Sequence, residues 1–287
     1  MCERPSVPRR STVPNYGLRA CPECRLEFLH PQPDDTVLAA IYDADYFLGE
    51  DTGQAAARRS EMKRATGVLY LDTLARLLPP ETTHLLEIGC GHGEVLLEAR
   101  SRGFRVAGIE VSAHAAAIAN RSLGTQAVSA GTVETLQLPH DRFGAVLAAD
   151  VIEHVRDPVR WLLRAQELLI PGGIVLLVTP SLDSWTRRIL RSRWMEYKVE
   201  HLHYFSAASI RLLLERCGFH DIHVSPNRKV LTIDYIARHF DRFPVPILTS
   251  LARWLRRVLP RRIAHRHLLV PASGLIATAR KAGAAAP

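Results

Sequence analysis

Leu85-Leu86-Glu87-Ile88-Gly89-Cys90-Gly91-His92-Gly93 is the stretch of sequence that decides the fold of this chain. It begins as an apolar run of strand length, and its three alternating glycines lead into a helical pattern over residues 94–102. Glycines between a strand and a helix let backbone N–H groups approach a ligand closely, at the positive end of the helix. The stretch therefore predicts a strand–loop–helix unit whose loop binds a ligand.

The residues that follow repeat this alternation of strand and helix. Ser112 has the position of a helix N-cap, and Asp157-Pro158 combines a capping acid with a proline at the first helical position. Strands that alternate with helices indicate crossover units and a parallel sheet, which right-handed crossovers make doubly wound. Strands are expected over residues 84–88, 104–109, 125–129, 143–149, 174–178, 219–224 and 267–279, the last broken at 271–274. Further helices are expected over residues 34–42, 54–78, 112–122 and 206–217.

The composition is that of a globular protein, with 47% hydrophobic and 23% charged residues in 287. This excludes a disordered, collagen-like or coiled-coil chain. The formal net charge is +8, and the basic residues are almost all arginines. No apolar run approaches the roughly 20 residues of a membrane span, and residues 1–10 lack the apolar stretch of a secretory signal. Together with five cysteines, an odd number, this predicts a reducing, cytoplasmic location.

Acidic residues near the glycines indicate the kind of ligand. Glu110 ends the second predicted strand, about twenty residues after the loop, where an acid hydrogen-bonds a ribose diol. The third glycine comes one residue earlier than in the Gly-x-Gly-x-x-Gly of dinucleotide enzymes, which also have little use for an acid at Glu87. A zwitterionic ligand such as an amino acid does have a use for it, because its ammonium group needs a counter-charge.

Residues 85–93 resemble motif I of the class I S-adenosylmethionine-dependent methyltransferases. Glu110 matches the acid that holds the ribose, and Glu134 matches the region beside the adenine. Residues 150–155 and 169–173 resemble motifs IV and V. The resemblance implies an α/β, doubly wound, mostly parallel seven-stranded sheet of the Rossmann-like methyltransferase fold, with the last strand antiparallel. It implies S-adenosyl-L-methionine as cofactor, bound by Glu87, Gly89, Gly91, Gly93, Glu110, Glu134 and Asp150.

Both ends of the chain are similar to a bacterial subgroup of these methyltransferases that carries a small N-terminal zinc ribbon. The N-terminal likeness lies in residues 28–33, in Tyr42 and in residues 45–47. The C-terminal likeness lies in residues 201–206 and 217–219.

Cys21-Pro22-Glu23-Cys24 has the spacing of a zinc knuckle. The subgroup's ribbon has two such pairs, but the only upstream cysteine here is Cys2, with Pro5 where its partner would stand. A closed tetrahedral site needs four ligands. The candidates are Cys2, Cys21, Cys24 and His30, and the alternative is a degenerate ribbon without metal.

Two groups of side chains are candidates for chemistry at the methyl acceptor. Asp150, Glu153 and His154 follow the fourth predicted strand, and their spacing resembles a set associated with a divalent metal in ubiquinone-pathway O-methyltransferases. They predict either an Mg²⁺ site or an ordered loop that lines the donor pocket without metal. His201 and His203 alternate on a segment that, if extended, would point them the same way, as a general base, a metal pair or a lid. The predicted catalytic residues are His201, His154 and His203.

Residues 238–266 contain eight arginines and a single acid. They include a basic amphipathic helix with arginines opposite an apolar face. That face is formed by Leu251, Trp254, Leu255, Val258 and Leu259. The helix is either a lid packed on the sheet with a solvated arginine face, or a surface for anionic lipid, an acidic substrate or RNA. Membrane-surface contact is predicted through residues 244–259. No aromatic-interleaved basic stretch indicates a nucleic-acid surface, so the expected partner is a small-molecule acceptor.

The chain is thus interpreted as five segments. They are a degenerate zinc-ribbon-like appendage (1–33), N-terminal helices (34–80), the S-adenosylmethionine-binding core (81–225), a basic helical cap insertion (226–266), and the final strand and tail (267–287). The expected activity is O-methylation of a hydroxyl on a small metabolite. The alternatives are C-methylation of a nucleotide sugar, then tRNA modification, and a non-catalytic methyltransferase-like binding protein. Acceptor identity and oligomeric state stay open at this point.

Overall fold

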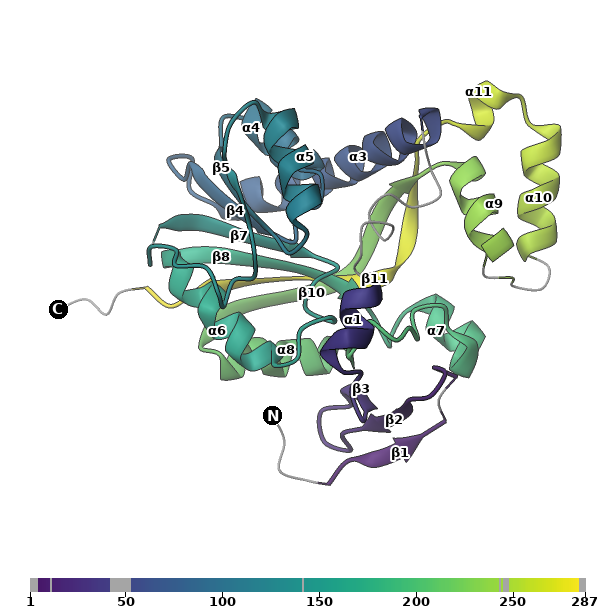
Figure 1. Ribbon diagram of the computed structural model, residues 1–287, viewed down its shortest axis with the longest axis horizontal. Coiled ribbons are helices and arrows are strands. Elements are labelled where there is room, and N and C mark those ends of the chain that lie inside the picture. The colour runs from purple at the N-terminus through teal and green to yellow at the C-terminus, as the bar shows by residue number, and fades with distance from the viewer. Residues whose placement is uncertain are drawn as a thin grey trace.

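The computed structural model describes residues 5–10, 12–41, 53–140, 142–242, 244 and 248–283. A seven-stranded sheet forms its centre (Figure 1). The strands are β4 (His84–Ile88), β5 (Arg105–Glu110), β6 (Val128–Ala130), β7 (Phe143–Ala149), β8 (Leu169–Pro180), β10 (Phe219–Leu231) and β11 (Leu268–Lys281). Their order is β10-β11-β8-β7-β4-β5-β6, and only the pairs that include β11 are antiparallel. The predicted α/β, doubly wound, mostly parallel sheet is confirmed.

Helices cover both faces of this sheet (Figure 1). The helices α3 (Gln54–Leu77), α4 (Glu94–Ser101) and α5 (Ala113–Leu123) lie on one face, and α6 (Pro158–Leu168) and α8 (Ala207–Arg216) lie on the other. The two predicted caps are confirmed, since Ser112 accepts a hydrogen bond from Ala115 N and Asp157 accepts from Val159 N and Arg160 N. Each such cap stabilises its helix by about 1 kcal/mol.

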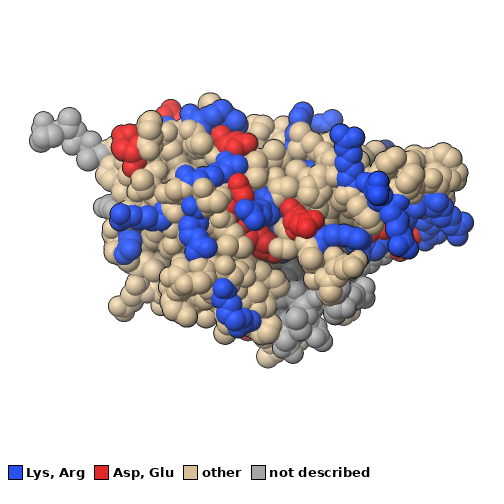
Figure 2. All heavy atoms as spheres, turned by 90° about the horizontal axis from the view of Figure 1, so that it is seen from above, with Lys and Arg blue, Asp and Glu red and all other residues tan. Residues whose placement is uncertain are grey.

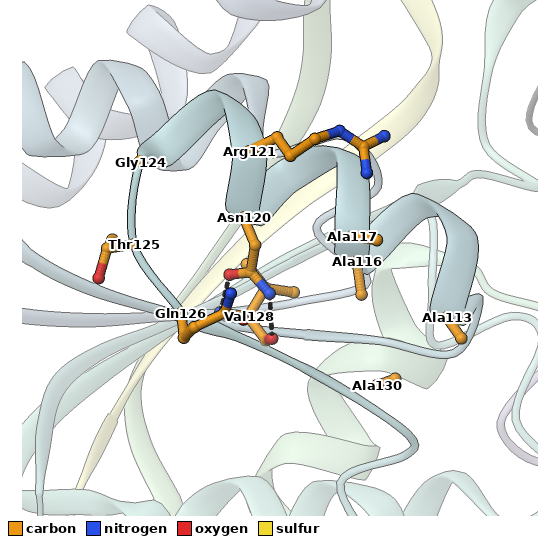
Figure 3. A pocket seen from close by; sticks show the side chains of 10 residues that line it. All are labelled: Ala113, Ala116, Ala117, Asn120, Arg121, Gly124, Thr125, Gln126, Val128 and Ala130. Carbon is orange, nitrogen blue, oxygen red and sulfur yellow. Dashed lines mark hydrogen bonds between the residues drawn. The ribbon is translucent and has the colours of Figure 1, made fainter.

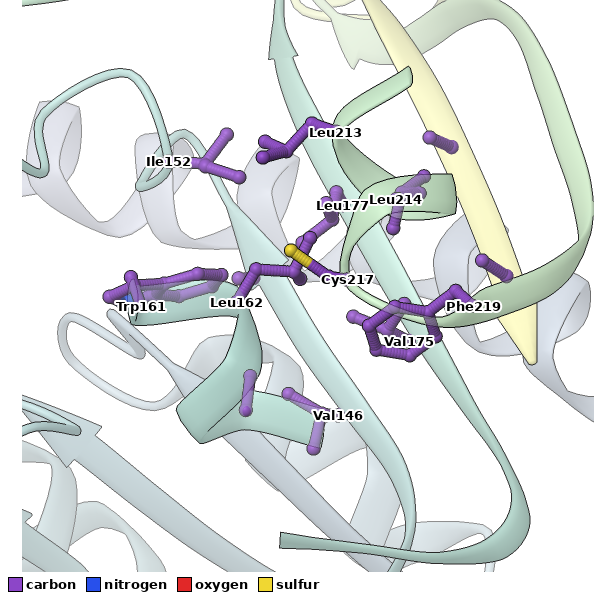
Figure 4. Close-up of a cluster of buried hydrophobic side chains, with 14 of the residues drawn as sticks. Val146, Ile152, Trp161, Leu162, Val175, Leu177, Leu213, Leu214, Cys217 and Phe219 are labelled. Atoms are coloured by element: carbon purple, nitrogen blue, oxygen red, sulfur yellow. The ribbon is translucent and has the colours of Figure 1, made fainter. Parts of the chain in front are cut away.

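The core lies in two layers, one on each side of the sheet. On the α6 and α8 side, Trp161 and Leu162 meet Leu213 and Leu214 over the sheet side chains (Figure 4). On the other side, residues of α3, α4 and α5 pack against the opposite faces of the same strands. Strands that are buried on both faces read as continuous apolar runs, and this explains why β4 and β7 have the predicted bounds.

The strands differ from expectation where glycine or proline interrupts the sequence. β8 begins at Leu169 rather than at residue 174, and the run Pro171–Gly173 lies inside it, beside a register shift against β7. β11 is not broken at 271–274, because it pairs with β10 on one side and β8 on the other, and bulges in the β10–β11 ladder absorb the irregularity. β10 continues to Leu231, so residues 226–231 are strand rather than helical insertion.

The N-terminal appendage forms a small antiparallel sheet. Its strands are β1 (Val7–Arg9), β2 (Gly17–Ala20), β3 (Glu27–His30) and, from far along the chain, β9 (His203–Tyr204). The helix α1 (Asp35–Ile41) follows it, where a helix is predicted. Tyr42 and residues 45–47, which carry part of the resemblance to the ribbon subgroup, lie outside the described residues.

The C-terminal helices form a cap that projects from the far ends of β10 and β11 (Figure 1). It comprises α9 (Ile233–Arg242), α10 (Leu248–Val258) and α11 (Arg261–Ala264). The helix α7 (Trp185–Leu190) and a short 3-10 turn (Arg191–Arg193) precede the segment that contains β9. None of the described helices combines the length and the apolar character needed to cross a bilayer.

Candidate active site

The glycine loop joins β4 to α4 at the carboxyl edge of the sheet. Gly89, Gly91 and Gly93 all have positive φ, at +74°, +54° and +83°. A Cβ atom on Gly89 would lie 2.4 Å from Cγ2 of Val151, so both the backbone angle and the space require glycine there. A Cβ atom on Gly91 would meet nothing within 4 Å. The backbone is therefore open on the Gly91 side, where a ligand has room to approach.

Glu110, at the end of β5, holds this loop in place. Its side chain is buried, its Oε2 accepts a hydrogen bond of 2.7 Å from Gly91 N, and its Oε1 accepts one of 3.0 Å from Ser112 N. Each carboxylate oxygen has two lone pairs, so acceptor capacity remains for the ribose hydroxyls of a bound donor. The structure thus places the predicted ribose ligand directly beside the glycine loop.

Glu87, two residues before the loop, is the best indicator of a cationic ligand. It is 4% exposed, and its Oε2 has no hydrogen-bond partner among the described residues. Burial raises the pKa of Glu87 well above its ordinary value, and the neighbouring carboxylate of Glu94 raises it further. Glu87, Glu94 and Glu110 are all buried around this loop. S-adenosylmethionine fits such a site, because its ammonium and sulfonium groups supply the missing positive charge.

Asp150 lies at the end of β7, with a positive φ of +56°. Its Oδ2 is 2.8 Å from Nζ of Lys229, which reaches over from β10. The ammonium group of Lys229 holds the pKa of Asp150 below its ordinary value. The predicted metal set of Asp150, Glu153 and His154 is therefore not the cluster that the structure brings together.

That cluster is Glu153, His154 and His201, whose potential ligand atoms all lie within 4.8 Å of one another. Oε2 of Glu153 accepts a hydrogen bond of 2.9 Å from Thr179, while its Oε1 has no hydrogen-bond partner among the described residues. The rings of His154 and His201 meet edge to face, with centroids 4.8 Å apart. The predicted catalytic residues His154 and His201 are thus adjacent, although 47 positions separate them in the sequence.

Backbone carbonyls fix the orientation of both rings. Nδ1 of His154 is 2.9 Å from Glu200 O, and Nδ1 of His201 is 2.8 Å from Glu196 O. An Nδ1–H that donates to a carbonyl leaves Nε2 as the acceptor or metal-ligating nitrogen of the neutral ring. Burial lowers the pKa of His154 to about 4 and that of His201 well below its ordinary value, so both rings are neutral at pH 7.

The pKa of Glu153 is shifted upward, whereas those of the two histidines are shifted downward. Burial and the nearby carboxylate of Asp150 disfavour the charged form of Glu153 and raise its pKa to about 8. One carboxylate and two imidazoles fit a divalent ion that accepts nitrogen ligands better than they fit Mg²⁺, which prefers oxygen. When bound, such an ion lowers the pKa of a coordinated hydroxyl.

His203 lies apart from this cluster. It is buried in β9, paired with Phe28 of β3, and its ring is tilted 6.2 Å from that of Phe205. His203 is the first residue of β9, whereas His201 precedes that strand and lies in the cluster with Glu153 and His154. A catalytic role for His203 stays a prediction.

Glu134 is exposed, and it lines a surface cavity of about 450 Å³ beside α6. Its place beside the adenine stays a prediction. A further cavity, of about 650 Å³, lies between α5 and residues 124–130 (Figure 3). The lining of that cavity is rich in alanine, the amide of Asn120 is already hydrogen-bonded to Val128, and no predicted donor-site residue takes part. Cavity size therefore does not locate the chemistry here.

Cys21 and Cys24 lie on the turn between β2 and β3. Both are buried, and Cys24 N is 3.5 Å from the Sγ of Cys21. No third histidine, cysteine or acid of the described residues comes within ligand distance of this pair, and Cys2 lies outside them. A zinc ion at Cys21 and Cys24 stays a prediction that requires ligands from beyond the described residues.

Two site residues, Lys229 and Thr179, were missed by sequence reasoning. Lys229 stands in a mixed stretch of β10, and nothing local indicates that this strand returns to the end of β7. The one available signal is its rarity as one of four lysines. Thr179 reads as part of a buried strand, and only the sheet order shows that it faces Glu153.

Comparison with known proteins identifies the fold and the family. A family model described as a methyltransferase domain matches residues 59–224, more than half of the chain. The ubiquinone biosynthesis O-methyltransferase of Cereibacter sphaeroides is 33% identical over 129 residues, which cover 42% of this chain and 52% of that protein. The tRNA U34 carboxymethyltransferase of Vibrio parahaemolyticus is 26% identical over 158 residues, 53% of this chain and 49% of that protein. The chain spans about half the length of these relatives.

Solved structures agree on the fold. A SAM-dependent methyltransferase from Archaeoglobus fulgidus has a TM-score of 0.53 at 17% identity, covering 86% of this chain and 100% of that one. A SAM-dependent methyltransferase from Thermotoga maritima has a TM-score of 0.51 at 21% identity, and the match covers 77% of this chain and 91% of that one.

The doubly wound sheet and its glycine loop define a Rossmann-like methyltransferase fold. With the family model matched over more than half of its length, the chain belongs to the methyltransferase domain family, and it has the fold of solved S-adenosylmethionine-dependent methyltransferases. The fold and family expected from residues 85–93 are confirmed.

Proposed function

We propose that this enzyme transfers a methyl group from S-adenosylmethionine to a hydroxyl of a small molecule. The observation that carries the proposal is the cluster of Glu153, His154 and His201, in which Glu153 and His201 are buried and His154 is partly buried. Glu153 and His154 follow the end of β7, at the edge where ligands bind in such sheets. A hydroxyl acceptor must lose a proton when its oxygen attacks the methyl carbon. The O-methyltransferase name of a relative that is 33% identical supports the same reaction class.

When bound, the cofactor supplies a methyl group already activated on a sulfonium, so much of the catalysis is proximity and orientation. His201 takes the hydroxyl proton at Nε2, because its Nδ1 is committed to Glu196 O. His154, held by Glu200 O, packs edge to face on that ring and fixes its plane. The oxygen–methyl bond forms as the carbon–sulfur bond breaks, and the departing products are the methyl ether and S-adenosylhomocysteine.

A divalent metal at Glu153, His154 and His201 is the second candidate for handling this proton. The ligand atoms lie within 4.8 Å of one another, which favours it. Removal of metal separates the two candidates. Protein treated with EDTA keeps full turnover if His201 is the base, and loses turnover that added Mn²⁺ or Mg²⁺ restores if the cluster binds metal.

The acceptor class is tested by supplying donor with a labelled methyl group to three acceptor sets: hydroxylated small molecules, nucleotide sugars and tRNA. O-methylation predicts label in the first set as an ether. Label on a sugar carbon supports the C-methyltransferase alternative, and label in tRNA supports nucleic-acid modification. His201→Asn is expected to lower turnover at least about a hundredfold, the usual contribution of a positioned base, without changing donor affinity.

Other properties follow from the sequence and stay predictions. They are a cytoplasmic location, a small-molecule rather than nucleic-acid partner, zinc at Cys21 and Cys24, Mg²⁺ near Asp150, and membrane-surface contact through residues 244–259. Of that last segment, the structure describes Pro244 and residues 248–259.

A further inference from the structure

The outer side of the C-terminal cap exposes large apolar side chains. Ten such side chains are exposed among the described residues, and five of them fall within residues 251–269. They are Leu251 (48% exposed), Trp254 (56%), Val258 (52%), Ile263 (48%) and Leu269 (51%). Single apolar residues scattered over a protein surface are normal, but a concentration of them in one short segment indicates an interaction surface.

Helix α10 presents these side chains as a stripe. Leu251, Trp254 and Val258 are spaced by three and four residues, so they lie on one face of the helix. Thr249 and Ala252 are buried, on the side of α10 that packs against α9. The alternative of a lid helix with its apolar face on the sheet is therefore wrong, since the small residues face inward and the large apolar ones face outward.

Positive charge surrounds the stripe. Residues 248–283 contain no aspartate or glutamate. Arg253 and Arg256 pair with acids of α9. Four more arginines on this segment are exposed and make no ion pair with a described residue: Arg257, Arg261, Arg262 and Arg266. Figure 2 shows blue side chains gathered at the end of the molecule that the cap forms.

We propose that the exposed face of α10, made of Leu251, Trp254 and Val258 with Arg257 on the same helix, binds the surface of an anionic lipid bilayer, and that the exposed Ile263 and Arg262 of α11 add to this contact. A bilayer interface offers an apolar phase and negative headgroups together, and tryptophan favours that depth. Nucleic acid would meet the arginines but leave the apolar stripe in water. A second copy of the chain would bring two arginine-rich faces together.

The test is sedimentation of the full chain with vesicles of phosphatidylcholine alone or with added phosphatidylglycerol. We expect binding to the anionic vesicles only, weakened by salt. Replacing the stripe in Leu251→Ser/Trp254→Ser/Val258→Ser should weaken binding at least roughly tenfold, because each side chain leaves an apolar phase. Arg257→Gln/Arg262→Gln should weaken it roughly thirtyfold. Leu163→Ser, at an exposed apolar residue of α6, is the matched control and should bind as the wild type does.

Donor titration of every variant shows that the fold is intact, and it makes the test independent of the methyl acceptor. Three results would overturn the proposal. The first is that folded wild-type protein fails to bind anionic vesicles at low salt. The second is that the stripe variant binds these vesicles as tightly as the wild type does. The third is a wild-type dimer, detected by light scattering, that the stripe variant abolishes, while neither the wild type nor the variant binds vesicles. RNA binding that the stripe variant leaves unchanged, with no vesicle binding, would assign the arginines to nucleic acid instead.

Discussion

The carboxylate of Glu110 accepts a hydrogen bond of 2.7 Å from the backbone N–H of Gly91, 19 positions earlier in the chain. Its other oxygen accepts from Ser112 N, at the start of α5. One side chain therefore ties the loop after β4 to the loop after β5. Two consecutive strand–helix units therefore hold the donor site together. The same carboxylate of Glu110 that orders the glycine loop is also the predicted hydrogen-bond acceptor for the ribose hydroxyls.

Glu110→Ala should weaken binding of S-adenosylhomocysteine by at least about tenfold. Hydrogen bonds to a charged group contribute roughly 1.5–3 kcal/mol, and the variant loses those to the ribose while freeing Gly91 N. Calorimetric titration measures the affinity. Glu81→Ala, an exposed acid before β4, serves as the control. Unchanged affinity in Glu110→Ala would mean that the donor does not lie beside this loop.

Gly89→Ala should destabilise the protein and abolish donor binding for two separable reasons. The new Cβ would lie 2.4 Å from Cγ2 of Val151, and φ is +74°. Trimming the neighbour in Gly89→Ala/Val151→Ala removes the clash but keeps the backbone strain of roughly 1–2 kcal/mol. Thermal unfolding of both variants measures the two costs. Stability of the double variant equal to that of Val151→Ala would show that the backbone angle costs nothing.

Glu87 should link donor binding to pH. In the folded protein without donor, its pKa is raised above the ordinary 4.5, so the folded state keeps a proton that the unfolded chain has lost. The free energy of unfolding then falls as pH rises from about 4.5 to the raised pKa, by at most about 1.4 kcal/mol per pH unit. A bound cation favours the ionised carboxylate, so donor binding should release a proton and tighten as pH rises.

Calorimetry in buffers of different ionisation enthalpy measures that proton. Glu87→Gln should remove the proton release and make the affinity less dependent on pH, while Glu81→Gln should change neither. Binding of S-adenosylhomocysteine, which lacks the sulfonium charge, should release fewer protons than binding of S-adenosylmethionine. An equal proton release from wild type and Glu87→Gln would assign the linkage to another group.

Much of this architecture was predictable from the sequence, because buried parallel strands leave an apolar signature. The bounds of β4 and β7 agree residue by residue with the expected 84–88 and 143–149, since both strands are covered on both faces. Glycine at position 144 of β7 is explained by local packing, because a Cβ atom there would lie 2.0 Å from Cγ2 of Thr82.

The remaining features depend on contacts between distant segments. The pairing of Lys229 with Asp150 requires that β10 return over the end of β7. The amphipathic pattern of α10 identifies a helix with two faces, but not which face meets the protein. The small residues Thr249 and Ala252 decide that, because they allow α9 to approach closely. Sequence periodicity alone does not determine which face of a helix packs against the rest of the protein.

The N-terminal sheet should set the position of His201 through Tyr197. The hydroxyl of Tyr197 donates a hydrogen bond of 2.6 Å to Oε2 of the buried Glu27 in β3, and its ring packs edge to face on Tyr204. β3 also pairs with β9, so the segment that carries His201 is held from the appendage side. The donor site lies on other elements and makes no use of this contact.

Tyr197→Phe should therefore loosen residues 194–205 while leaving donor affinity unchanged. It leaves a buried carboxylate oxygen without its donor, at a cost of about 1–3 kcal/mol. Amide hydrogen exchange should accelerate in that segment, and turnover should fall. Glu27→Leu/Tyr197→Phe should recover part of the stability, because removing both partners is less costly than removing one. Tyr235→Phe in α9 is the control, since Tyr235 stacks on His239 within the cap. Exchange rates over 194–205 that match the wild type would show that the appendage does not position His201.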